Sequence, residues 1–137
     1  MRRLLREIAA GDTARGDTDS ERAFYLFLTR LRARGGLVLP GLEDVRRALA
    51  DTTRAVVAFA DAVPSPKPTS LTLLVSDGRI LAACRRGRTL HLSCDAGPRH
   101  ALVVASERIG PGPWTEVPEE GFVGTEDGRT AVRGPLA

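Results

Sequence analysis

The hydrophobic pattern of this chain changes its period at the proline-rich stretch "PSPKP" (64–68), and this change limits the folds that it can adopt. Before the stretch, apolar residues recur at steps of three and four, which is the spacing of an amphipathic helix. After it, they form short runs bounded by turn residues, as in β-strands. Proline lacks an amide proton and disfavours helical angles in the preceding residue, so the helical part ends there.

Two long helices are expected before the proline-rich stretch. The first presents Phe24, Phe27, Leu28 and Leu31 on one face, with Leu26 at a second apolar edge, and ends at the glycines of "RGG" (34–36). The second is expected over 41–62, and a short amphipathic helix is expected over 2–10. The apolar face of the second long helix should consist of Leu42, Val45, Leu49, Thr52, Val56, Phe59 and Val63.

Strands are expected from residue 69 onward. "TSLTLLVS" and "RILAACR" flank Asp77-Gly78, which suits a type I′ hairpin turn. Further strands are expected in "RTLHLSC" (88–94), in "ALVVAS" (101–106) and in a hairpin around Asp127-Gly128, with "IGPGPWTEVPEEG" as an irregular connection. The runs "LTLLV" and "ALVVA" are almost continuously apolar, which predicts strands buried on both faces. Helices first and strands afterwards predict an α+β fold, with two long helices packed on an antiparallel sheet.

The length of 137 residues predicts one domain. Within it we expect a helical part (1–63), the proline-rich linker (64–68) and antiparallel strands (69–134).

The net charge of +3 comes from twenty basic residues, all arginine except Lys67, and these are scattered along the chain, which disfavours a nucleic-acid-binding surface. No apolar run approaches the ~20 residues of a membrane span, and the N-terminus lacks the apolar core of a signal peptide. A cytoplasmic location is therefore expected.

Candidate catalytic groups are scarce. Cys84 and Cys94 lack the spacing of a zinc or redox motif and are interpreted as buried thiols, so neither a metal nor a cofactor is expected. Cys94 with His100 is a formal nucleophile and base pair, but a structural thiol and a surface imidazole are favoured, and His91 lies within an expected strand. No Gly-x-Ser-x-Gly turn and no phosphate-binding loop is present.

The segment "TDSE" (18–21) is the candidate site. Thr18 and Glu21 have the spacing of a capping box, in which each side chain bonds the backbone amide of the other residue. Asp19 is not needed for that box, so its carboxylate can point outward from the first helical turn toward a cationic ligand, such as a substrate ammonium group.

Three blocks of the sequence together resemble the class II glutamine amidotransferases, which are N-terminal-nucleophile hydrolases. The blocks are "GDTDSERAFYLFLTRL", "SLTLLVSDGRILAACRRG" and "ALVVASERIGPGPWTEVPEEGFVG", and they span residues 16–124 in the order of that family. The resemblance is to its small stand-alone branch, which includes the ergothioneine-pathway amidohydrolase type. It implies a four-layer αββα sandwich, of which this chain would form half. It also implies that Asp19 binds the α-amino group of glutamine or a γ-glutamyl compound, with Thr18, Ser20 and Glu21 as its scaffold.

The chain departs from the family pattern at the catalytic residues. Residue 2 is Arg2, whereas the family uses an N-terminal cysteine exposed by removal of the initiator methionine. The substrate-carboxylate arginine and the Asn-Gly oxyanion segment of the family normally precede the "TDSE" block, and nothing here matches them. Arg108 also stands where the family commonly has proline after Ser-Glu. The chain therefore resembles the C-terminal half of a glutaminase domain, and no catalytic residue is assigned to it.

Three interpretations remain open at this point. In the first, a partner polypeptide carries the N-terminal nucleophile, and the two together form one glutaminase domain. In the second, the chain is a degenerate homologue that serves as a non-catalytic binding or assembly subunit, with homo-oligomers as an expected form. In the third, it is an arginine-rich α+β module that binds nucleic acid.

Overall fold

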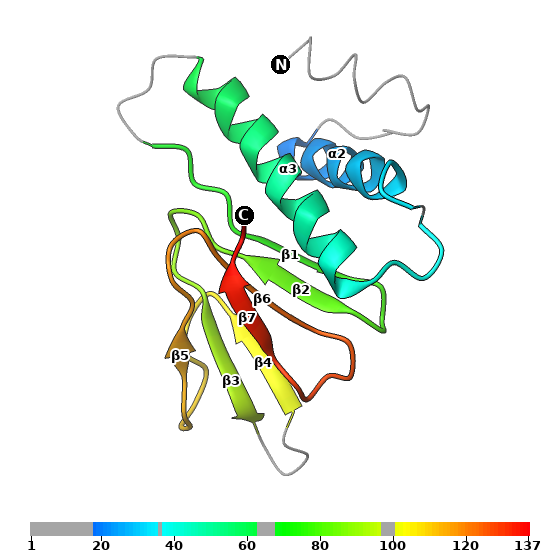
Figure 1. Ribbon diagram of the computed structural model, residues 1–137. Coiled ribbons are helices and arrows are strands. Elements are labelled where there is room, and N and C mark those ends of the chain that lie inside the picture. The colour runs from blue at the N-terminus through cyan, green and yellow to red at the C-terminus, as the bar shows by residue number, and fades with distance from the viewer. Residues whose placement is uncertain (1–17, 36, 63–67, 97–100) are drawn as a thin grey trace. The chain divides into compact units, whose positions relative to one another are not determined.

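The computed structural model describes residues 18–35, 37–62, 68–96 and 101–137. The expected helix at 2–10 lies outside these residues. The chain divides into two compact units, Met1–Lys67 and Pro68–Ala137, with the boundary inside the proline-rich stretch. Both units are shown in Figure 1. Among the described residues, neither helix is long and apolar enough to cross a lipid bilayer.

The first unit contains two helices that pack against each other, α2 (Asp19–Arg32) and α3 (Leu42–Asp61). The bounds of α3 agree with the expected span of 41–62 to within one residue, and α2 ends just before the glycine stretch at which it was expected to stop. Helix α2 ends before Gly35, whose φ of +142° suits glycine. Helix α3 begins after Gly41, whose amide donates to the Asp44 carboxylate over 3.4 Å. Because hydrogen bonds from Arg46 and then Arg47 stabilise its charged form, the pKa of Glu43 in the first turn is lowered to about 2.

The buried faces of the two helices follow the helical period, but several residues expected on them are only partly buried, namely Leu28 on α2 and Leu42, Val56 and Phe59 on α3. The expected residue Val63 lies outside the described residues. Thr52 is completely buried, and its hydroxyl donates to the Ala48 carbonyl over 2.7 Å, so this polar group is satisfied. Phe24, which was expected on the buried face of α2, is 49% exposed and instead contacts the Tyr25 and Phe27 rings. The buried residues are Ala23, Leu26, Phe27 and Leu31 on α2, and Val45, Ala48, Leu49, Ala50, Thr52 and Thr53 on α3.

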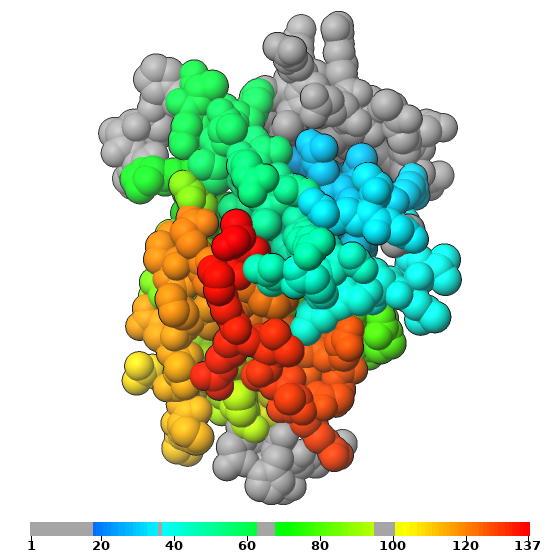
Figure 2. All heavy atoms as spheres, viewed as in Figure 1, coloured from blue at the N-terminus to red at the C-terminus, as the bar shows by residue number. Residues whose placement is uncertain are grey.

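The second unit contains two antiparallel sheets (Figure 1). The first sheet has the order β1-β2-β6-β7, and the second has the order β4-β3-β5. The strands are β1 (Leu73–Ser76), β2 (Leu81–Cys84), β3 (His91–Ala96), β4 (Ala101–Ala105), β5 (Thr115–Glu116), β6 (Gly121–Thr125) and β7 (Val132–Pro135). The expected α+β class is confirmed, although the strands form two sheets and not one. Figure 2 shows β7 at the surface of this unit, in red, in agreement with the exposure of all its residues.

A common hydrophobic core joins the two sheets. It combines Ala83 of β2 and Val123 of β6 with Leu92 of β3 and Leu102 of β4, so the sheets face each other as the layers of a sandwich. Leu90 and Val117 complete the buried cluster. The expectation that "LTLLV" and "ALVVA" are buried on both faces is wrong, because Leu74 is 52% exposed and Leu102 is the one buried residue of β4. The strands most deeply buried are β2 and β6, since both lie in the middle of their sheet.

The hairpin between β1 and β2 differs from the expected type I′ turn. In a type I′ turn both central residues have positive φ, but here Gly78 has a φ of +89° and Asp77 does not. The Asp77 carboxylate instead accepts the amides of Arg79 and Ile80, at 2.9 and 2.6 Å, and the strands are joined by a four-residue loop. The side-chain bonds of Asp77 thus determine the turn geometry.

Candidate functional site

The segment "TDSE" begins helix α2. Thr18 has extended backbone angles (φ −82°, ψ 145°), and its hydroxyl oxygen accepts the Glu21 amide over 3.2 Å. Its carbonyl accepts the Arg22 amide, which is the first bond of the helical ladder. Thr18 is therefore the N-cap residue, and this geometry places Asp19 and Ser20 in the first turn.

Asp19 points into solvent. Its side chain is 82% exposed, and its carboxylate lies 3.8 Å from the Arg22 guanidinium, one turn further along the helix. An ion pair this long and this exposed contributes little to stability. The carboxylate can therefore exchange this contact for a ligand cation at small cost.

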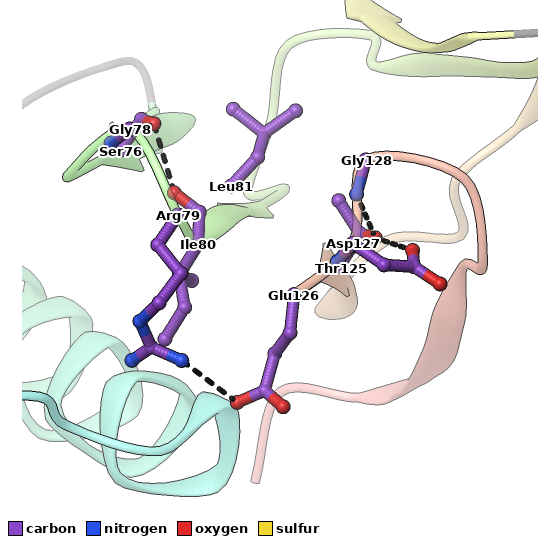
Figure 3. A pocket seen from close by; sticks show the side chains of 9 residues that line it. All are labelled: Ser76, Gly78, Arg79, Ile80, Leu81, Thr125, Glu126, Asp127 and Gly128. Carbon is purple, nitrogen blue, oxygen red and sulfur yellow. Dashed lines mark hydrogen bonds and ion pairs between the residues drawn. The ribbon is translucent and has the colours of Figure 1, made fainter.

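The sheet unit also carries a pocket of about 430 Å³ between the β1–β2 and β6–β7 loops (Figure 3). An ion pair between Arg79 and Glu126 links the two loops, with 4.0 Å between its charged atoms. The remaining lining residues are Ser76, Gly78, Ile80, Leu81, Thr125, Asp127 and Gly128. Sequence reasoning did not single out this pocket, although each Asp-Gly dipeptide marked one of its loops.

The Asp127 carboxylate in this pocket is already used by the fold. Asp127 accepts the Thr130 hydroxyl at 2.6 Å and the Thr130 and Arg129 amides at 2.7 and 2.8 Å. These bonds lower the pKa of Asp127 far below its usual range, so it remains an anion that holds its loop. A general base has to be free to accept a proton, and Asp127 does not meet that condition.

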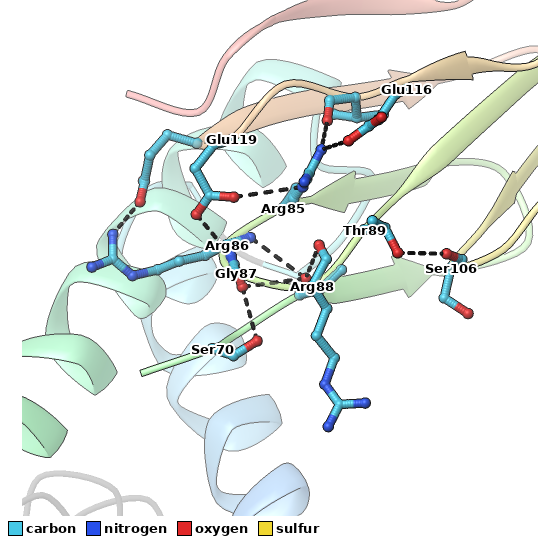
Figure 4. Close-up of polar contacts among 12 residues, drawn as sticks. Ser70, Arg85, Arg86, Gly87, Arg88, Thr89, Ser106, Glu116 and Glu119 are labelled. Atoms are coloured by element: carbon cyan, nitrogen blue, oxygen red, sulfur yellow. Dashed lines mark hydrogen bonds and ion pairs between the residues drawn. The ribbon is translucent and has the colours of Figure 1, made fainter. Parts of the chain in front are cut away.

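The basic loop "RRGR" (85–88) is tied to an acidic segment (Figure 4). Arg85 donates to Glu116 and to the Val117 carbonyl, both at 2.6 Å. Arg86 pairs with Glu120, and the Gly87 amide donates to Glu119 over 2.7 Å. A phosphate group would have to displace these carboxylates, so the loop is poorly suited to bind nucleic acid.

The cysteines and histidines do not form a reactive group in the described residues. Cys84 is fully buried, whereas Cys94 is only partly buried and accepts a hydrogen bond from Arg133 over 3.1 Å, so the expectation of a buried thiol is wrong for Cys94. His91 is buried within β3, and His100 lies outside the described residues. In the part of the chain that the structure describes, no three histidine, cysteine, aspartate or glutamate residues gather in a way that could hold a metal ion.

The fold is similar to that of a solved structure, a glutamine aminotransferase class-II domain protein from Silicibacter pomeroyi. The two superpose with a TM-score of 0.79 at 22% sequence identity, over 99% of this chain and 61% of that chain. This chain thus spans about three fifths of the length of the protein it matches. No protein-family model and no curated protein matches the sequence.

Proposed function

We propose that this chain is the C-terminal portion of a class II glutamine amidotransferase-like glutaminase domain, which is active only with a complementary segment that carries the N-terminal cysteine. The observation that carries the proposal is the fold similarity, which extends over 99% of this chain but only 61% of the class II domain protein. That proportion agrees with the sequence resemblance, in which the catalytic residues precede the "TDSE" block.

In this proposal Asp19 holds the α-ammonium group of glutamine or of a γ-glutamyl compound. The ammonium group would replace the Arg22 guanidinium, which now lies 3.8 Å from the carboxylate. The cap formed by Thr18 and the Glu21 amide fixes the backbone of the first turn, so the Asp19 side chain extends from a fixed position. Ser20 completes the turn that presents it.

Catalysis would be divided between the two segments. The complementary segment would supply the cysteine nucleophile and the oxyanion donors that stabilise the charge developing on the amide oxygen. This chain would supply the contact that holds the substrate while its side-chain amide meets the nucleophile. On its own it would not hydrolyse glutamine.

The first test is native mass spectrometry of the untagged chain purified from its own cells, with N-terminal sequencing of any polypeptide that elutes with it. The expected partner has cysteine as its mature first residue, and the pair releases ammonia from glutamine. Asp19→Asn in the pair should raise the KM for glutamine roughly tenfold or more, because a charge-assisted hydrogen bond contributes about 1.5–3 kcal/mol.

Thr18→Ala is the matched control, because it removes the helix cap but leaves the Asp19 carboxylate. It should lower the free energy of unfolding by about 1 kcal/mol and raise the KM less than Asp19→Asn does, because the carboxylate itself remains. If Asp19→Asn leaves the KM unchanged, the ammonium role of Asp19 is wrong.

The second candidate is a non-catalytic binding or assembly subunit with the same fold. It is favoured by the internal use of the polar groups described above, since Asp127, Arg85 and Arg86 are all bonded within the fold. Recovery of homo-oligomers of this chain, with no cysteine-bearing partner, would support this candidate and contradict the first.

A further inference from the structure

One row of side chains crosses the inner face of the four-stranded sheet. The strand registers pair Leu74 with Ala83, Ala83 with Val123, and Val123 with Arg133. Directly opposite residues in antiparallel strands point to the same face, so all four side chains face the second sheet. Ala83 and Val123, in the middle of the row, are almost completely buried in the core between the sheets.

The two ends of this row differ in chemistry. At the β7 end, Arg133 donates a hydrogen bond to the Sγ atom of Cys94 on the opposing sheet, over 3.1 Å, so a charged side chain bridges the two sheets at this edge. At the β1 end, Leu74 is 52% exposed although it points to the same face as the buried Ala83. An inward-pointing charge is a common means of protecting a sheet edge, and the β1 end lacks one.

The backbone of β1 is also suited to accept another strand. Bonds from the Leu71 amide to the Arg86 carbonyl and from the Asp77 amide to the Ile80 carbonyl continue the β1–β2 ladder at both ends. These bonds set the alternation of the ladder, in which every second residue directs its backbone groups toward β2. Leu74 is an odd number of residues from both Leu71 and Asp77, so it belongs to the alternate set, whose amides and carbonyls point away from β2.

The other sheet edges are protected. Strand β7 contains Arg133 and Pro135, and β5 has only two residues, one of them Glu116. On β4, the Leu102 amide already donates to the Gly128 carbonyl over 3.1 Å. Strand β1 has no charged residue, no proline and no bulge in its pairing. Among the edges that the structure describes, β1 therefore has the least protection against pairing with another strand.

We infer that the complementary segment binds along β1, where an extended apolar stretch adds a strand to the sheet and covers Leu74. This inference rests on the proposed function, because the class II domain protein has about two fifths of its chain beyond the part matched here. Main-chain hydrogen bonds to the Leu74 peptide groups would give affinity, and the apolar contact with its side chain would fix the register.

The test compares Leu74→Lys with Val132→Lys in the full-length chain. Leu74 and Val132 are almost equally exposed, at 52% and 50%, and both lie on edge strands of the same sheet, but Val132 is on the opposite face. The probe is the cysteine-bearing polypeptide recovered in the mass spectrometry above. Leu74→Lys should weaken its binding by ~100-fold, as expected when a buried leucine becomes a charged group, and Val132→Lys should weaken it by less than about threefold.

Hydrogen exchange on the unmodified pair gives a second measurement that does not depend on a variant. The Leu74 amide should exchange more slowly in the pair than in the chain alone, whereas the β7 amides should not change. If the pair forms and hydrolyses glutamine while Leu74→Lys binds normally and the Leu74 amide is not protected, the docking site is wrong and the proposed function stands. If no cysteine-bearing polypeptide pairs with the chain, both are wrong.

Discussion

At the scale of single residues, aspartate carboxylates form the loops of the sheet unit. Asp127 accepts the Thr130 hydroxyl and the amides of Arg129 and Thr130, and Asp77 accepts two amides in the β1–β2 loop. These bonds favour the charged form, so the pKa of each carboxyl is lowered, chiefly by Thr130 for Asp127 and by the Ile80 amide for Asp77. The folded state therefore gains stability from these carboxyls when they are ionised.

We predict that Asp127→Asn lowers stability most near neutral pH. A lowered folded pKa gives stability that is present above the unfolded pKa of about 3.9 and is lost as pH falls toward the folded value. Asparagine keeps one oxygen for the Arg129 and Thr130 amides but replaces the other, which accepts the Thr130 hydroxyl, with an NH2 group, so it resembles the protonated carboxyl. The urea midpoints of variant and parent should therefore differ most at about pH 7 and differ less at about pH 3. Glu107→Gln, at an exposed position, is the control, and an equal difference at both pH values would contradict this account.

The sequence was informative where residues that act together are close along the chain. Thr18 and the Glu21 amide are three residues apart, so the cap of α2 could be expected from the pattern alone. The contact between Arg85 and Glu116 joins residues 31 positions apart, and no local pattern marks such a pair. Asp19 could be singled out because it lies within the local pattern of Thr18 and Glu21. The pocket could not, because its two loops are far apart in the sequence.

At the scale of elements, periodicity predicted the helices well and the short strands poorly. The second helix was expected over 41–62 and is observed over Leu42–Asp61, because six turns of apolar spacing determine its extent. Strand β5 was missed, since two residues within a proline-rich and glycine-rich connection carry no alternation. It forms because Thr115 and Glu116 pair with Leu92 and His91, a contact that depends on the tertiary fold.

The loop after β2 gives a prediction at this scale. Gly87 has a φ of +85°, and a Cβ atom there would lie 2.7 Å from the Ser70 hydroxyl oxygen and 2.9 Å from the Ser70 Cβ. Gly78 has a similar φ of +89°, but a Cβ atom added to it would meet no other atom within 4 Å. Gly78→Ala should therefore lower the free energy of unfolding by about 1 kcal/mol, because alanine is strained in the left-handed conformation. Gly87→Ala should lower it further, because Ser70 has to move as well.

Urea unfolding monitored by circular dichroism measures both costs. The double variant Ser70→Gly with Gly87→Ala, compared with Ser70→Gly alone, should show a cost for Gly87→Ala close to that of Gly78→Ala, because the two clashing side-chain atoms are gone. Equal costs for the two single glycine variants would show that the Ser70 contact does not constrain the loop.

At the scale of the whole molecule, the chain exposes apolar side chains in both of its compact units. Between α2 and α3, Val38 and Leu39 are 86% and 77% exposed, and Leu39 has a φ of +52°, which is uncommon for a leucine. In the sheet unit, Leu74 and Ile109 are exposed. Apolar side chains exposed singly are normal on protein surfaces, so the adjacent pair Val38 and Leu39 is the more unusual feature. It agrees with a chain that supplies part of a larger domain.

The last prediction follows from these surfaces. Without its complementary segment, the chain should self-associate at tens of micromolar, since the open apolar face beside Leu74 can pair with a second copy. Sedimentation velocity over a concentration series should show a weight-average mass that rises with concentration. The rise should be reduced in Leu74→Lys, kept in Val132→Lys, and removed when the proposed cysteine-bearing partner is added, because that partner is proposed to cover the same edge. A chain that remains a soluble monomer throughout the series would contradict both the open edge and the need for a partner.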